Sequence, residues 1–244
     1  MYAMHLKPDG SSYKGKVDTF VTNTDGSLAL TDVDIGPDGH MYFCVGGRKG
    51  QSYLYRVRYV GDESTELSPL DTSSKHYQAR KTRHKIEAFH GKSNPKAIET
   101  VWSYLSSDDY HLRYAARIAI EWQDPKTWAN KAYGEPNDLA AIHALLGLAR
   151  CDFDGSQQPS IDRLLKVDFS KLDKIGKLAL LRTYSVIMSR AGKPDDAQIG
   201  AIGKQLDPHY PASDDNLNEE LCRVLCYLQH PSVVSKTIAL MKTT

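Results

Sequence analysis

The chain has 244 residues, of which 41% are hydrophobic and 25% are charged. This composition is typical of a globular protein and argues against a disordered or collagen-like chain. The 31 Lys and Arg residues nearly balance the 30 Asp and Glu residues, which leaves a formal net charge of +1. Such a molecule has no overall field that would hold DNA or an anionic membrane. We therefore expect a soluble protein with no nucleic-acid partner and no membrane span.

The first 60 residues alternate short β-favouring runs with turn signals. Pro8-Asp9-Gly10 and Pro37-Asp38-Gly39 suit tight reversals, because Pro presets one φ angle and Gly accepts a positive φ. Strands are predicted at 17–22, 28–35, 41–45 and 54–59. Four such strands would form an antiparallel meander of the size of one propeller blade. Within the last strand, Tyr55, Val57 and Tyr59 share a face that we expect to be buried.

An acidic run at 62–71 and a basic run at 75–85 follow, with few large apolar residues. This composition is typical of a linker. The sequence thus predicts a β domain at 1–70, a charged linker at 71–91 and a helical domain at 92–244. The linker contains His76, His84 and His90 among its cations. It could attract an acidic polysaccharide or an acidic partner, or it could be a solvated connection.

From residue 94 onward, apolar residues recur at helical spacing, as in Leu139, Ile142, Leu146 and Ala149. Ala115, Ala116 and Ala119 would let one helix approach a neighbour closely. Helix pairs are predicted at 95–107 with 110–122, 125–133 with 136–151, 159–167 with 173–191, and 194–206 with 216–229, and a last helix begins near residue 231.

Pro residues at 95, 125, 159, 194 and 231 open these segments at intervals of 30 to 37 residues. Helix pairs that repeat at this length are typical of HEAT-like α-solenoids. The predicted fold class is therefore α+β and mainly α, with a small antiparallel meander followed by a HEAT-like solenoid of about four to five helix pairs. An irregular helical bundle is the alternative.

Four residues of the β part form a candidate ligand loop. Asp32 and Asp34 project from the same strand face, and paired carboxylates can bind a hard cation or perform acid and base chemistry. Arg48 and Gln51 lie in or beside a glycine-rich loop whose backbone could approach an anion. The alternatives are turn and strand-edge hydrogen bonding for the carboxylates and a plain hairpin for the loop. No catalytic residue is predicted, because no GxSxG or comparable motif occurs.

The four cysteines form no CxxC or CxxCH motif, so neither a zinc ribbon nor covalent haem is predicted. Cys222 and Cys226 are four residues apart and could hold a soft metal with further ligands. We instead expect them to pack as small buried residues in an apolar helix seam. His143 is expected to be a hydrogen-bonded core residue. No cofactor and no metal site is therefore expected in this chain.

Several segments together resemble a known family. They are LKPDGSSY at 6–13, TDVDIGPDG at 31–39, MYF at 41–43, GGR at 46–48, QS at 51–52, LYRV at 54–57, EAFHG at 87–91 and RYAARIAIE at 113–121. The chain is similar to large secreted proteins of planctomycete and verrucomicrobial bacteria that join a sugar-dehydrogenase-like β-propeller, HEAT-like helices and a c-type cytochrome domain. The resemblance covers the propeller end and the helical region.

The resemblance implies a slice of a longer extracytoplasmic or periplasmic protein, with haem c only in a further C-terminal domain. The expected function is a non-catalytic scaffold that contacts neighbouring domains or a partner protein. One alternative is a fragment of a quinone- or calcium-dependent sugar oxidoreductase. Another is a carbohydrate-binding module that uses Tyr42, Tyr53, Tyr55 and Tyr59 as stacking platforms.

Overall fold

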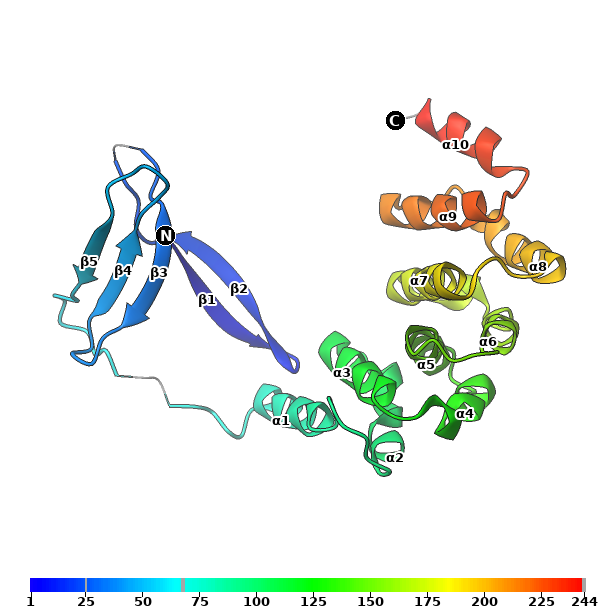
Figure 1. Cartoon of the computed structure of the whole chain (residues 1–244), viewed down its shortest axis with the longest axis horizontal. Coiled ribbons are helices and arrows are strands. Elements are labelled where there is room, and N and C mark those ends of the chain that lie inside the picture. Colours follow the sequence, from blue (N-terminus) through cyan, green and yellow to red (C-terminus); the bar gives the residue numbers. More distant parts are fainter. Residues whose placement is uncertain (25, 67–68, 243–244) are drawn as a thin grey trace. The chain divides into compact units, whose positions relative to one another are not determined.

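The computed structural model describes residues 1–24, 26–66 and 69–242. The protein is α+β and mainly helical, with two small antiparallel sheets (Figure 1). It divides into two compact units, Met1–Gln78 and Ala79–Thr244. Each unit is described by itself below.

The first unit contains a hairpin and a separate three-stranded sheet. Strands β1 (Tyr2–Asp9) and β2 (Ser12–Thr19) pair along their whole length. Gly10, at φ 53°, makes the tight turn between them. Strands β3 (Leu30–Ile35), β4 (Met41–Val45) and β5 (Tyr53–Val57) follow in the order β3-β4-β5.

The prediction of one four-stranded meander was wrong. The first predicted strand begins at residue 17, whereas β2 begins at Ser12 and pairs with β1 through the first Pro-Asp-Gly turn. Residues 20–24 and 26–29 form no strand, and they include Asn23, Gly26 and Ser27, which favour turns over a ladder. This interruption leaves two sheets, of two and three strands.

The apolar side chains of the first unit are mostly exposed. In its described part, only Phe43 and Val45 are buried apolar residues. The predicted burial of the Tyr55 and Tyr59 face was wrong, because these side chains are 44% and 52% exposed. Ile35, at 62%, is also exposed. A three-stranded sheet without a second layer cannot remove its apolar residues from water.

The second unit is built from helices and short 3₁₀ turns. Its α-helices are α1 (Lys75–Glu87, which begins in the first unit), α2 (Ala97–Val101), α3 (Tyr110–Glu121), α4 (Ala129–Gly134), α5 (Asp138–Arg150), α6 (Gln157–Leu164), α7 (Lys174–Ala191), α8 (Asp196–Leu206), α9 (Asp215–Tyr227) and α10 (Val233–Met241). The 3₁₀ turns are Trp102–Ser106, Pro125–Thr127, Phe169–Lys171 and Asp207–His209. Each helical segment predicted from the sequence overlaps a helix of the structure, and the segments 95–107 and 125–133 each cover a short helix and a 3₁₀ turn.

The helices of this unit form two layers (Figure 1). Helices α3, α5, α7 and α9 pack side by side in chain order, and α2, α4, α6 and α8 lie against them. Helix α10 packs on α9. Each helix of the first layer therefore contacts mainly the adjacent helices of that layer and the short helices beside it.

Side-chain caps define where several of these helices begin. Asp173 Oδ1 accepts a hydrogen bond of 2.7 Å from the Gly176 N–H at the start of α7. Asp195 Oδ1 accepts one of 2.8 Å from the Gln198 N–H at the start of α8. These bonds satisfy N–H groups that have no partner inside the helix. At its other end α7 stops at Gly192, whose φ of 85° breaks the helical path.

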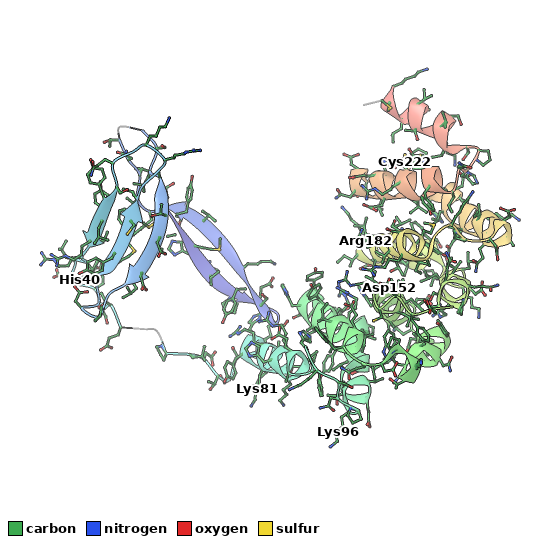
Figure 2. The ribbon with its side chains drawn as sticks, in the orientation of Figure 1. His40, Lys81, Lys96, Asp152, Arg182 and Cys222 are labelled. Atoms are coloured by element: carbon green, nitrogen blue, oxygen red, sulfur yellow. The ribbon has the colours of Figure 1, made fainter. Side chains whose placement is uncertain are left out.

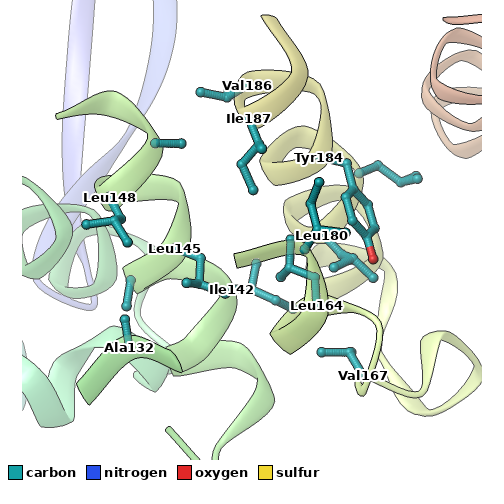
Figure 3. Packing of buried hydrophobic residues seen from close by; sticks show 14 of the residues in the cluster. Ala132, Ile142, Leu145, Leu148, Leu164, Val167, Leu180, Tyr184, Val186 and Ile187 are labelled. Atoms are coloured by element: carbon teal, nitrogen blue, oxygen red, sulfur yellow. The ribbon is translucent and has the colours of Figure 1, made fainter. Parts of the chain in front are cut away.

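Helix α5 is the centre of the core. Its Ile142, Leu145 and Leu148 side chains are fully buried, and Figure 3 shows Ile142 on the side of α5 that faces Leu180 of α7. A Cβ atom at Gly147 would lie 3.4 Å from Glu121 Cγ on α3, which is ordinary van der Waals contact, so α5 and α3 lie close together at this glycine. As predicted, Ala115, Ala116 and Ala119 are buried in the same cluster.

Polar side chains link α4, α6 and α8. Arg163 on α6 donates hydrogen bonds of 3.0 and 2.8 Å to the Glu135 carbonyl, which follows α4. Gln198 on α8 donates a hydrogen bond of 3.1 Å to the Gln158 carbonyl of α6. The first two bonds satisfy the carbonyl group that follows the C-terminal end of α4, and the third links α8 to the first turn of α6.

The segment predicted as a charged linker, 71–91, is largely helical in the structure. Helix α1 occupies Lys75–Glu87, and Ile86 is buried in the main core. The cations divide between its faces: Arg80 is buried, whereas Lys81 is exposed (Figure 2). Arg83 Nε lies 3.2 Å from the Glu87 carboxylate. Composition alone missed this helix because few large apolar residues anchor it.

Candidate functional site

A hollow of about 450 Å³ lies between α3, α5 and α7. We call it the arginine hollow. It is lined by Tyr110, Arg113, Tyr114, Arg117, His143, Leu146, Arg150, Ile175, Leu178, Ala179, Arg182 and Val186. None of the described residues that line it is acidic. Its size is within the range of ligand pockets, about 300–1,000 Å³.

Helical spacing brings these side chains to one face. On α3, Tyr110, Arg113, Tyr114 and Arg117 follow one another at intervals of three, one and three residues. Residues at such positions line one side of a helix. Arg150 on α5 and Arg182 on α7 complete the set of four guanidinium groups; Figure 2 labels Arg182.

Two of the four arginines are neutralised in part by one carboxylate. Glu121, at the end of α3, forms ion pairs with Arg117 and with Arg150, whose Nε lies 3.0 Å from Glu121 Oε1. Within the described residues, no carboxylate forms an ion pair with Arg113 or Arg182. The hollow therefore keeps positive charge that the protein does not itself compensate.

Arg113 holds this charge in a buried position. The residue is 3% exposed, and its Nη1 donates a hydrogen bond to the Ser107 carbonyl. Its Nε is buried and has no partner among the described residues. A buried guanidinium with an unsatisfied donor is costly, so an anion that reached it would be strongly favoured.

His143 lines the same hollow from α5. Its Nε2 is buried without a partner in the described part of the chain, so the prediction of a hydrogen-bonded core histidine was wrong. Burial, and then the positive charges of Arg113 and Arg117, lower the pKa of His143 to about 4. The imidazole is therefore neutral at pH 7.

Aromatic side chains form one rim of the hollow. The rings of Tyr110 and Tyr114 stack with centroids 6.1 Å apart, and their residues are 59% and 48% exposed. The Arg117 guanidinium lies over the Tyr114 ring at 5.0 Å. This rim offers an exposed apolar surface beside fixed positive charge, which is a combination suited to binding an anionic group with an apolar neighbour.

The candidate ligand loop of the β unit is split in the structure. Val33 and Phe43 are opposite each other across β3 and β4, whereas Asp32 pairs with Cys44 and Asp34 with Tyr42. Since successive strand residues alternate between faces, the two carboxylates lie on the face opposite Phe43. Each accepts a 2.8 Å hydrogen bond from the N–H of the next residue.

Arg48 and Gln51 instead lie with Phe43. Both line a hollow of about 420 Å³ in the β unit, together with Tyr53 and Tyr55. Neither Asp32 nor Asp34 lines that hollow. The structure thus brings Arg48 and Gln51 together but separates them from the two aspartates.

The four tyrosines considered for sugar stacking do not form one platform. Tyr42 shares the face of Asp34, and its hydroxyl donates a 2.7 Å hydrogen bond to Asp38. The rings of Tyr53 and Tyr55 are tilted by 44° to each other. Tyr55 stacks on Phe43 at 5.0 Å, which is the cross-strand packing that the sequence alternation allows.

The expected burial of the two C-terminal cysteines was wrong for Cys226 and holds in part for Cys222, which packs against the main core. Cys222 is half-buried and Cys226 is exposed on α9, with their sulfur atoms 3.8 Å apart. Both are free thiols. In the part of the chain that the structure describes, no group of three or more His, Cys, Asp or Glu residues is placed to hold a metal ion.

Reasoning from the sequence missed the arginine hollow. The sequence does contain one indication of this site. Tyr and Arg occur twice on the same face of one predicted helix, at Tyr110, Arg113, Tyr114 and Arg117. The contributions of α5 and α7 had no such signal. Arg182 stands 65 residues after Arg117, and only the packing of three helices brings them to one hollow.

Comparisons of the chain with protein-family models, with curated proteins and with solved structures each give no match. The similarity to propeller, helical and cytochrome proteins therefore stays a prediction. Among the described helices, none combines the length and apolar character needed to cross a membrane.

Proposed function

We propose that this chain is a non-catalytic interaction segment whose helical unit binds a neighbouring domain or a partner protein. The observation that carries the proposal is the arginine hollow between α3, α5 and α7, where arginines without a carboxylate partner among the described residues lie beside the exposed rings of Tyr110 and Tyr114. Surfaces of this composition are enriched at protein interfaces, where Tyr and Arg supply much of the binding energy.

In this proposal the helices work as a HEAT-like α-solenoid. Support comes from the two layers, in which α3, α5, α7 and α9 each pack on the next. Because each pair in a solenoid contacts mainly its neighbours, one side of each layer stays available for other molecules. The β unit would be a propeller-blade remnant, and its exposed apolar residues, such as Leu54 at 68%, are the kind that adjacent blades cover.

By resemblance, the parent protein is extracytoplasmic, and the helices space a propeller from a haem-bearing domain. Both statements are parts of the proposal. The proposal assigns no chemical reaction to this chain's own residues. It is supported by the separation of Asp32 and Asp34 from the hollow that Arg48 and Gln51 line.

The proposal is tested by assaying the whole purified chain for sugar oxidation. The chain is supplied with pyrroloquinoline quinone, calcium, a panel of aldoses and an electron-accepting dye. We expect no sugar-dependent dye reduction, while a soluble quinoprotein sugar dehydrogenase assayed in parallel reduces the dye. Sugar-dependent turnover by the chain would replace the scaffold proposal with the oxidoreductase alternative.

A further inference from the structure

We propose that the arginine hollow binds an acidic peptide segment of a partner protein, in which carboxylate side chains alternate with large apolar ones. This inference rests on the proposed function and specifies its ligand. It begins from Arg113 and Arg182, which have no carboxylate partner among the described residues. Arg113 is buried with an unsatisfied Nε, whereas Arg182 is exposed on the opposite helix.

The two arginines differ in what they would contribute. Arg182 can meet an approaching carboxylate in water and steer it inward. Arg113 lines the hollow and is already desolvated, so a carboxylate that contacts its guanidinium would cost little further desolvation of the protein. A planar guanidinium matches the two oxygens of a carboxylate.

The rest of the lining favours a ligand that is not purely ionic. Ile175, at 54% exposed, and the half-buried Leu178 give α7 an apolar edge next to Arg182. Tyr110 and Tyr114 form an aromatic edge on α3. A bare phosphate or sulfate would leave these surfaces exposed, whereas an apolar side chain beside the carboxylate would cover them.

A peptide fits this lining better than a polyanion does. Nucleic acids and sulfated polysaccharides are held by many cations along a track, but here Glu121 already engages two of the four arginines. The net charge of +1 adds no long-range attraction for such polymers. A short peptide carries carboxylate and large apolar side chains close together, so a carboxylate can enter the hollow while apolar side chains of the same peptide meet the rims.

The test measures peptide binding to the full chain by fluorescence anisotropy. The probe is a labelled pool of short synthetic peptides in which Asp or Glu alternates with Leu, Phe or Tyr. A matched pool carries Asn and Gln in place of the acids. We expect saturable binding of the acidic pool that weakens with added salt, and no binding of the amide pool.

Two charge reversals locate the site. Arg182→Glu should weaken binding of the acidic pool at least about tenfold, the equivalent of losing one charge-assisted contact. Lys204→Glu changes the net charge equally at an exposed position on α8 and should leave the affinity within about twofold, as expected for a distant surface charge. Circular dichroism of both variants checks that the helices are retained.

Three results would overturn the inference. They are no binding of the acidic pool, equal loss of binding in both variants, and tighter binding of a heparin fragment or single-stranded DNA that is also sensitive to Arg182→Glu. The last result would assign the hollow to polyanions. None of these results involves sugar turnover, so failure here is distinguishable from failure of the scaffold proposal.

Discussion

Burial accounts for the properties of two residues in the arginine hollow, the neutral His143 and the charged Arg113. His143 has two guanidinium groups near it and a buried Nε2, which is why its pKa is lowered to about 4. The same burial makes Arg113 a binding group, because its Nε has lost water without gaining a protein acceptor. Both residues store unfavourable free energy that an anion would relieve.

The lowered pKa of His143 predicts a specific loss of stability in acid. The unfolded chain takes up a proton on this residue near pH 6.5, whereas the folded chain does so only near pH 4. As pH falls from 6.5 to 4, unfolding is therefore favoured, and the loss reaches about 3 kcal/mol at pH 4.

Urea denaturation of the wild type and of His143→Gln at pH 7 and pH 4 measures this loss. Carboxylate groups also titrate in this range, but they do so in both proteins. We expect the free energy of unfolding to fall by about 3 kcal/mol less in the variant. Equal falls in the two proteins would contradict a buried neutral His143.

At the scale of the element, residues close in the sequence determine where a helix begins. Which of its faces are buried depends on the helices that pack against it. Asp173 and Asp195 cap α7 and α8 with side-chain bonds to N–H groups three residues on. Such caps need no tertiary contact. The buried surface of α5, by contrast, is wider than one stripe: Leu145 and Leu148 are fully buried beside the predicted Ile142, because neighbours pack on several sides of it.

The cap of α8 can be tested alone. Asp195→Ala removes the acceptor of the Gln198 N–H bond and should lower the free energy of unfolding by about 1 kcal/mol. Asp195→Ser keeps an oxygen acceptor and should recover most of that loss. Urea denaturation at neutral pH measures both variants. If Ser costs as much as Ala, the capping bond does not hold the helix start.

At the scale of the whole molecule, the two units differ in what stabilises them. The helical unit contains the main buried cluster, centred on α5 and α7. In the described part of the β unit, buried apolar residues are limited to Phe43 and Val45. Since burial of apolar surface is the main source of stability, the β unit should be the weaker of the two.

Hydrogen exchange measured by mass spectrometry tests this difference. Amides of β3, β4 and β5 should exchange faster than those of α5 and α7 by about two orders of magnitude or more, because they open without unfolding the helical core. A partner that covers the sheets should slow them. Equal protection of both units in the isolated chain would show that the β unit has stabilising contacts beyond those described.

The sequence by itself determined the local features of this protein. The Pro-Asp-Gly turns, the order and approximate limits of the helices after residue 94, and the close packing of Ala115 and Ala116 all follow from backbone preferences or from spacing along one helix. These depend on residues near one another in the chain. The coarse α+β class, mainly helical, was therefore readable without coordinates.

Only the tertiary structure decided which of these features work together. It split the predicted four-stranded meander into two sheets, and it placed Asp32 and Arg48 in separate surroundings. It also joined Arg113 and Arg182 across three packed helices. The physical reason is that side chains far apart in the sequence meet only when whole helices pack together. The spacing of residues along one helix does not determine which helix it packs against.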